Sequence, residues 1–189
     1  MISGTCKGRR LFAVKGLDLR PTSDRVKEAI FDILQNRCRD QKVLDLFAGT
    51  GALGVEALSR GARGAVFIEK NPRSLATLRK NITLCGLSEQ AEILPLDVFI
   101  GLRTLEARGE AFGLVFLDPP YGQGLADRAL ERLTKSSMIS PETLVVAEHS
   151  AQEEPRSSAP LRRVDFRRYG NTRVSFYQNL PEDAHIHSP

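Results

Sequence analysis

The sequence has few cysteines, no apolar run long enough to cross a membrane and no apolar stretch at its start, where it reads "MISGTCKGRR". Its three cysteines, Cys6, Cys38 and Cys85, are far apart, without CxxC spacing and without a histidine cluster beside them. This pattern argues against a zinc site and a disulfide framework, so we interpret the cysteines as reduced packing residues. Together these absences predict a cytoplasmic protein that binds neither a membrane nor a metal.

Length and composition predict one domain. A chain of 189 residues with 41% hydrophobic content can bury one substantial core. We expect a single domain over residues 1–178, in which residues 1–36 form an N-terminal extension, and a monomer in solution. The residues after Gln178 show no periodicity, so we predict a disordered tail over 179–189.

The net charge of +4 is modest but unevenly distributed. Lysine and arginine gather in the segments 7–10, 20–27 and 162–173, outside the central part of the chain. Such basic segments fit a polyanionic partner, although a scatter of solvated surface charge explains them equally well.

Apolar strand-like runs alternate with amphipathic stretches through the centre of the chain. Strands are expected at 42–47, 64–69, 91–97, 113–118 and 143–149, and helices at 52–61, 72–86, 98–109 and 124–135. Strands that alternate with helices imply a mostly parallel sheet covered by helices on both faces. The runs 161–170 and 173–178 flank a short turn and predict an antiparallel hairpin at the sheet edge, which makes seven strands.

The first 36 residues predict an extension to this sheet. Residues 3–14 are typical of a short β-hairpin, and residues 22–34 of a helix. The apolar face of that helix is expected to hold Val26, Ala29, Ile30, Ile33 and Leu34.

A glycine pattern connects the first central strand to the helix that follows it. Gly49, Gly51 and Gly54 form GxGxxG, in which glycine permits a tight turn and close approach of a ligand to the backbone. Glu69 ends the next strand twenty residues after Gly49, where its carboxylate can accept hydrogen bonds from ribose hydroxyls. The pattern favours a cofactor that contains adenosine.

Two cofactor classes fit these residues, a nicotinamide dinucleotide and S-adenosylmethionine. Asp45 lies inside the end of the strand before the glycines, where a buried acid needs a partner. The ammonium and sulfonium groups of S-adenosylmethionine suit that carboxylate, whereas an anionic pyrophosphate is repelled by it. Asp97 is placed to reach the adenine amino group, and a helix cap for residues 98–109 is the alternative.

The run "GLVFLDPPYGQG" ends a strand with an acid, two prolines and a tyrosine. Two prolines make a rigid, non-helical turn and leave carbonyl groups free to accept hydrogen bonds. Asp118 and the carbonyl of Pro119 can together hold an exocyclic amine with its lone pair aimed at a methyl donor. Tyr121 offers a face on which a base can stack. The turn therefore predicts methylation of an amine on a nucleobase.

Four blocks in the chain resemble the bacterial RsmD family over nearly its whole length: "RPTSDRVKEAIFDIL", "VLDLFAGTGALGVEAL", "LDPPY" and "RRYGNTRVSFY". The resemblance implies a class I, Rossmann-like methyltransferase fold and methylation of the N2 amine of a guanine in small-subunit (16S) ribosomal RNA. Adenine-N6 enzymes that act on RNA or DNA share the DPPY motif and are the alternative. A nonenzymatic RNA-binding module would be expected to have lost Glu69 or Asp118, and both are present.

The family pattern implies contacts to S-adenosylmethionine by Asp45, Glu69, Asp97 and the glycine loop, which includes Thr50, with Gly54 behind it. Catalysis is implied at Asp118, Pro119 and Tyr121. Thr22 and Arg25 resemble parts of the cleft wall. Asp32 and Asn171 depart from the family, which often has Asn and Asp there. The expected partner is ribosomal RNA in the small subunit or its assembly intermediate, bound through six basic residues: Lys7, Arg9, Arg10, Arg20, Arg25 and Lys27.

Overall fold

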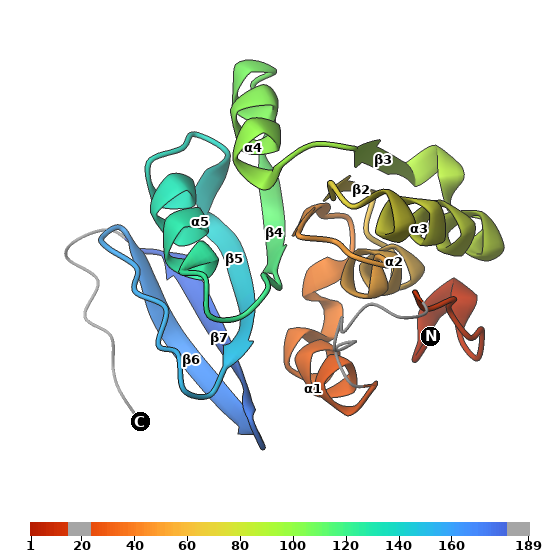
Figure 1. Ribbon diagram of the computed structural model, residues 1–189, viewed down its shortest axis with the longest axis horizontal. Coiled ribbons are helices and arrows are strands. Elements are labelled where there is room, and N and C mark those ends of the chain that lie inside the picture. Colours follow the sequence, from red (N-terminus) through yellow and green to blue (C-terminus); the bar gives the residue numbers. More distant parts are fainter. Residues whose placement is uncertain (15–23, 181–189) are drawn as a thin grey trace.

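A mixed sheet of seven strands forms the centre of the protein (Figure 1). The computed structural model describes residues 1–14 and 24–180. The strand order is β3-β2-β1-β4-β5-β7-β6, in which β1 to β5 are parallel and β7 is antiparallel to both neighbours. The strands are β1 (Lys42–Leu46), β2 (Gly64–Ile68), β3 (Ala91–Leu94), β4 (Phe112–Leu117), β5 (Ile139–Ser150), β6 (Leu161–Tyr169) and β7 (Thr172–Asn179). The predicted mostly parallel sheet, with an antiparallel hairpin at its edge, is confirmed.

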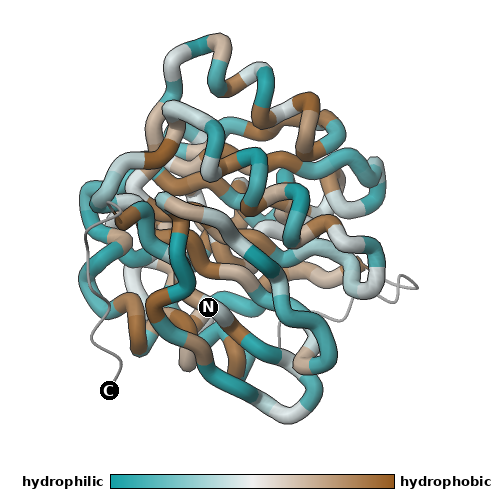
Figure 2. The backbone as a smooth tube through the Cα atoms, turned by 90° about the vertical axis from the view of Figure 1, so that its left-hand side faces the viewer, coloured by the Kyte–Doolittle hydropathy of each residue, from teal (hydrophilic) through white to brown (hydrophobic). Residues whose placement is uncertain are grey.

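Helices cover both faces of the sheet. One face carries α1 (Asp24–Leu34), α2 (Ala52–Ser59) and α3 (Pro72–Cys85), and the other carries α4 (Val98–Ala107) and α5 (Leu125–Thr134). Successive strand residues enter the two cores alternately: Val43 packs under α1 to α3, and Leu44 packs under α4 and α5. Figure 2 shows the hydrophobic segments running through the middle of the molecule and the hydrophilic ones around them. Three short 3-10 helices complete the description: η1 (Gly4–Cys6), η2 (Gln35–Cys38) and η3 (Ser88–Gln90).

Local sequence signals set the ends of two helices. The Asn71 side chain accepts hydrogen bonds from the backbone N–H groups of Arg73 and Ser74, and Pro72 occupies the first helical position of α3. The Asp97 side chain accepts a hydrogen bond from Phe99 N and so caps α4. Asn and Asp are among the residues preferred at this position, so both caps are explained by local sequence.

The parallel strands end together and define one edge of the sheet. Leu46 of β1 pairs with Leu117 of β4, and Leu117 pairs with Ala147 of β5. The loops that follow these strands therefore emerge side by side, at what we call the carboxyl edge. Because β7 is antiparallel to β5, with Thr172 opposite Ser150, the turn between β6 and β7 lies at this edge as well.

The predicted N-terminal β-hairpin is wrong, because residues 1–14 contain a 3-10 helix and no strand. The backbone N–H groups of Ile2 and Ser3 donate to the carboxylate of Glu56 instead of pairing with another strand, at 2.9 and 3.0 Å. The N–H of Cys6 donates to the hydroxyl of Ser59. The segment is therefore held against the end of α2 by contacts more than 50 residues apart.

Two smaller expectations also need correction. Ile33 of α1 is 37% exposed, while Phe31 is fully buried and packs beside Phe116, so the buried face of α1 is rotated from the predicted one. Strand β7 continues to Asn179, and Leu180 N donates to Pro160 O, so the first two residues of the predicted tail are ordered. Residues 181–189 lie outside the described part of the chain. No helix within the described ranges combines the length and apolarity needed to span a membrane.

We predict that Glu56→Gln lowers the free energy of unfolding by about 1–3 kcal/mol. Glu56 is fully buried and also accepts a hydrogen bond from Arg60, so the amide leaves a backbone N–H without an acceptor and removes the countercharge of Arg60. Urea unfolding measures the change. As a control, Glu131→Gln, which breaks only an exposed pair with Lys135, should stay within about 0.5 kcal/mol of wild type. Equal effects of the two substitutions would contradict this role of Glu56.

Candidate active site

The glycine loop between β1 and α2 needs its glycines. Gly49 and Gly51 have φ angles of +56° and +80°, in the left-handed region that side chains rarely adopt. A Cβ atom on Gly51 would lie 2.3 Å from Leu78 Cδ1, and one on Gly54 would lie 2.3 Å from Phe67 Cε1. The loop and the first turn of α2 are therefore pressed against α3 and β2, which leaves the loop backbone facing the carboxyl edge.

Glu69 connects the ends of β1 and β2. Its two carboxylate oxygens accept hydrogen bonds from Gly49 N at 2.8 Å and from Asn71 N at 2.6 Å. An ionised carboxylate has about four acceptor positions, so two are left for hydroxyl groups of a ligand. Glu69 thus holds the glycine loop in place and keeps the capacity that the sequence assigned to it.

Asp45 is only 2% exposed, and its Oδ2 atom accepts a hydrogen bond from Gly54 N at 2.9 Å. Burial raises the pKa of this carboxyl group to about 7, against the opposing effect of the Gly54 hydrogen bond, and the nearby negative charge of Glu69 raises it further. A positive charge beside Asp45 would favour the ionised carboxylate. The chemistry of this group therefore fits a cationic ligand.

Asp97 serves as a helix cap and also forms an ion pair. Its Oδ1 accepts from Phe99 N at 3.0 Å, and its Oδ2 lies 3.1 Å from Lys70 Nζ. Partial burial raises the pKa of Asp97, but the hydrogen bonds from Lys70 and Phe99 outweigh this effect and lower it overall. The cap, which was the alternative interpretation, is confirmed, and a contact with adenine stays a prediction.

Asn81 is a residue of the site that the sequence did not reveal. It is fully buried within α3, and its Nδ2 donates to the carbonyl of Thr50 in the glycine loop at 2.9 Å. The same amide exchanges hydrogen bonds with the backbone N–H and carbonyl of Phe12. One side chain therefore joins the N-terminal segment to the glycine loop. Its signal in the sequence is a polar residue on the mostly apolar face of α3.

The Asp118-Pro119-Pro120-Tyr121 turn follows β4 directly. Since Leu46 and Leu117 are register partners, the residues after β1 and after β4 are neighbours, and the turn lies next to the glycine loop. Pro119 is buried, whereas the side chains of Asp118 and Tyr121 are half-buried. Beyond the turn, Gly122 N donates to the carboxylate of Glu153. The structure thus brings the predicted cofactor residues and catalytic residues to one edge.

Glu148 is a second residue that sequence reasoning missed. Leu117 pairs with Ala147, so Asp118, which follows β4, and Glu148 of β5 come directly after neighbouring residues at the carboxyl edge. Glu148 is 5% exposed. The next residue, His149, is bonded through Nε2 to Ser175 and through Nδ1 to the carbonyl of Ser150, and its burial lowers its pKa. His149 is therefore a histidine whose two ring nitrogens are both hydrogen-bonded within the protein.

The predicted RNA contacts are scattered. Arg9 donates to the carbonyl of Leu84 near the end of α3, a 14-residue helix that begins at the carboxyl edge, so Arg9 lies about 20 Å along the helix from that edge. The exposed residues Lys7 and Arg10 flank it, and Arg25 is exposed at the start of α1. Arg20 and Thr22 lie outside the described residues.

The structure places Lys27, another predicted RNA contact, in a buried position. Its side chain is 5% exposed, and its Nζ lies 3.3 Å from Oδ1 of Asp24, whose side chain is 95% exposed. Little of the Lys27 side chain is accessible, and its contact with RNA stays a prediction.

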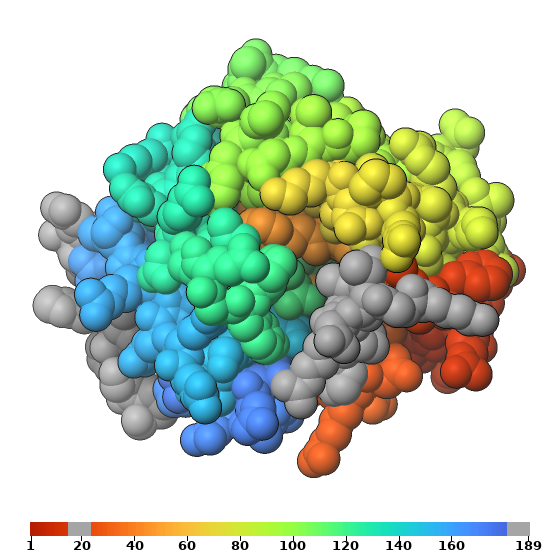
Figure 3. Space-filling model, viewed as in Figure 1, coloured from red at the N-terminus to blue at the C-terminus, as the bar shows by residue number. Residues whose placement is uncertain are grey.

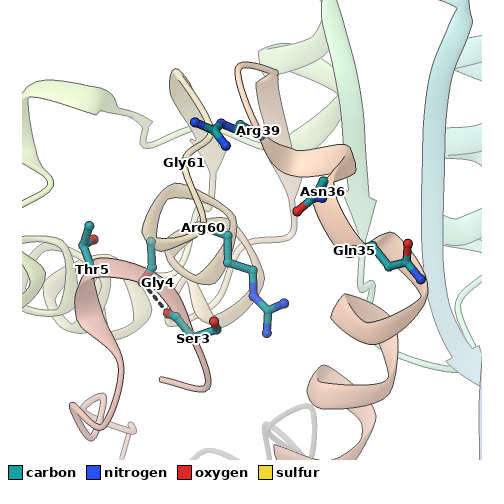
Figure 4. Close-up of a pocket in the computed structure, with 9 residues that line it drawn as sticks. Ser3, Gly4, Thr5, Gln35, Asn36, Arg39, Arg60 and Gly61 are labelled. Carbon is teal, nitrogen blue, oxygen red and sulfur yellow. Dashed lines mark hydrogen bonds between the residues drawn. The ribbon is translucent and has the colours of Figure 1, made fainter.

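A cavity of about 600 Å³ lies away from the glycine loop, at the opposite end of α2 (Figure 4). Arg39 and Asn36 line one side of it, and Ser3, Gly4 and Arg60 line another. The Arg60 guanidinium is already bonded to Glu56 and lies over the ring of Phe31, 4.7 Å from its centroid. Among the described residues no group of three potential ligands could hold a metal ion.

Comparison with known proteins gives concordant matches. The family model described as "Conserved hypothetical protein 95" matches residues 1–178. YlbH of Bacillus subtilis is 35% identical over 179 residues, which cover 94% of this chain and 97% of YlbH. "Ribosomal RNA small subunit methyltransferase D" of Haemophilus influenzae is 38% identical over 149 residues, 78% of this chain and 77% of the relative. The solved structure of yhhF from Escherichia coli matches with a TM-score of 0.82 and 32% identity, over 95% of this chain and 97% of that one.

We predict that Asp45→Asn becomes more stable relative to wild type as the pH rises. Because the pKa of Asp45 is about 7 in the folded state and lower in the unfolded state, the folded protein binds more protons between about pH 4 and pH 7. Wild-type stability from this group therefore falls as the pH rises, while asparagine keeps an acceptor for Gly54 without that loss. The difference should widen by about 2–3 kcal/mol between pH 5 and pH 8.

Urea unfolding of both proteins at four pH values tests this, with the exposed Asp32→Asn as a control. A constant difference between the Asp45 variant and wild type across the range would show that the carboxyl group does not titrate as described.

Proposed function

The chain belongs to the Conserved hypothetical protein 95 family of S-adenosylmethionine-dependent methyltransferases, which includes RsmD, and we propose that it methylates the N2 amine of a guanine in small-subunit ribosomal RNA. The observation that carries this proposal is the Asp118 to Tyr121 turn beside the glycine loop at the carboxyl edge. The name of the Haemophilus influenzae relative, ribosomal RNA small subunit methyltransferase D, supports the choice of RNA.

The cofactor of the proposed reaction is S-adenosylmethionine, which supplies an electrophilic methyl group on its sulfonium. Gly51 and Gly54 let the loop and the start of α2 pack closely against Leu78 and Phe67, since a side chain at either position would collide with the protein. Glu69 has acceptor capacity left for the ribose hydroxyls, and the buried carboxyl group of Asp45 suits a cationic neighbour. Asp97 lies at the next strand end and is proposed to face the adenine.

Asp118 and Pro119 carry the proposed catalysis. The lone pair of an exocyclic aromatic amine is delocalised into the ring, so it is a poor nucleophile until the amine is oriented. The carboxylate of Asp118 and the carbonyl of Pro119 accept hydrogen bonds from the two N–H groups of the amine, which turns its lone pair out of the ring plane toward the methyl group. The prolines hold both acceptors rigid, and Tyr121 stacks on the base.

The architecture suits a substrate whose own fold already exposes the target base. Within the described residues there is one α/β domain and no added element of the kind that reads a DNA sequence in the major groove. We therefore favour the small ribosomal subunit or an assembly intermediate in the cytoplasm as the substrate, since exposed loops there offer unstacked bases.

A methyl-transfer assay with labelled S-adenosylmethionine tests the function. Small subunits from cells that lack the enzyme, naked ribosomal RNA and DNA are incubated in parallel, and the products are digested to nucleosides. N2-methylguanosine in small-subunit RNA is the expected result. Label in N6-methyladenine would overturn the guanine assignment and leave the amine chemistry, and no label in any nucleic acid would overturn both.

We predict that Asp118→Ala lowers kcat by about 10²–10³-fold, because one of the two acceptors that orient the amine is removed. Binding of S-adenosylmethionine, measured by calorimetry, should change less than about twofold, since Asp118 is assigned to the amine. The exposed Glu89→Ala serves as a control and should keep wild-type rates. Full activity of the Asp118 variant refutes its assignment.

A further inference from the structure

The hairpin formed by β6 and β7 carries an unusual density of arginine. The hairpin carries Arg163, Arg167, Arg168 and Arg173 together with the exposed Phe166, and we call these five residues the hairpin surface. Arg167 follows Phe166 along β6, so its side chain lies on the other face of the strand. β6 is the last strand of the sheet, so its outer edge pairs with no other described strand. Within this surface Phe166, Arg167 and Arg168 are exposed, whereas Arg163 and Arg173 are half-buried.

Strand register places this surface close to the candidate active site. Arg168 is opposite Arg173, which is opposite His149, the residue after Glu148. β5 is the direct neighbour of β4, and with strands about 4.8 Å apart β6 lies roughly 15 Å from the end of β4. In Figure 3 the blue hairpin residues lie beside the green residues that follow β4. By contrast, Arg9 lies near the opposite end of α3.

The arginines of the hairpin surface outnumber the acidic residues that form ion pairs with them. Glu154 is shared by Arg163 and Arg173, at 2.9 and 3.6 Å, and Asp165 pairs with Arg167. Arg168 is exposed, forms none of the ion pairs found among the described residues and donates only to the carbonyl of Gly170. Two carboxylates thus face four guanidinium groups, so the surface keeps a net positive charge.

Phe166 gives the surface a second kind of contact. Its ring is 46% exposed, and the guanidinium carbons of Arg163 and Arg173 lie 5.3 and 5.0 Å from its centroid. Charges alone are enough to protect an edge strand from pairing with another chain. An exposed aromatic ring does not serve that purpose, but an aromatic ring among arginines is the arrangement on which bases of single-stranded nucleic acid stack.

We propose that the hairpin surface binds the single-stranded RNA next to the target nucleotide, with Phe166 stacked on a base and the arginines on the flanking phosphates. The choice of RNA rests on the proposed function. Because the β6–β7 turn lies at the carboxyl edge, RNA bound there would hold the target base near the Asp118 turn. The basic residues of the N-terminal segment lie farther from that edge.

Binding measurements on the whole protein test this, using a labelled single-stranded RNA of mixed sequence and small ribosomal subunits over a range of salt concentrations. The variants are Arg167→Ala with Arg168→Ala, and separately Phe166→Ala. Arg79→Ala with Lys80→Ala, two exposed residues of α3, is the charge-matched control. S-adenosylmethionine affinity and melting temperature verify that each variant is folded.

The double arginine variant should weaken RNA binding about tenfold and reduce the slope of log K against log salt by about 1.4–1.8, for two lost phosphate contacts. Phe166→Ala should weaken binding at least fivefold and leave the slope unchanged, since stacking releases no counterions. The control should reproduce the wild-type curve. Hairpin variants that bind like the control while wild type methylates RNA would overturn the inference alone. A wild type that methylates no RNA but shows the expected slopes would overturn the proposed function alone.

Discussion

The common register of the parallel strands β1, β4 and β5 is the constraint on which the candidate site depends. Side chains alternate along each strand, so a slip of one residue would turn Asp45 or Glu148 to the other face of the sheet and would displace Asp118, which follows β4. Both faces are buried under helices, so a slip in register would move the apolar residues next to these acids out of the two cores. The free energy lost with that burial fixes the register. The polar chemistry at the edge is thus positioned by the apolar pairing behind it.

The site combines rigidity with a buried acid. Glu69 and Asn81 bind the glycine loop from two directions, and the prolines fix the turn after β4. Asp45 is held inside the protein against its preference for water, which is why its pKa rises. A scaffold with two well-packed cores can tolerate such a group, and a cationic ligand would relieve it.

The features that the sequence predicted are those encoded by neighbouring residues. The Asp97 cap, which was the alternative interpretation of that residue, the glycine turn and the Asp118-Pro119-Pro120 turn each depend on residues close together in the sequence. The features it missed depend on distant partners. The N-terminal segment donates hydrogen bonds to Glu56 and does not form a hairpin. The Lys27 side chain is buried, and Glu148 is a neighbour of Asp118 only because β4 pairs with β5. Alternation in a short sequence window carries no information about which distant group will satisfy a backbone donor.

The double hydrogen bond of Glu69 has a consequence for the thermodynamics of ligand binding. Because Gly49 and Asn71 are already fixed by its carboxylate, the loop does not have to become ordered when a ligand arrives. Association should therefore lose little conformational entropy, and its heat-capacity change should reflect the apolar surface that is buried and little coupled folding. The association rate should then be set by diffusion and desolvation, because the glycine loop does not have to close before the ligand binds.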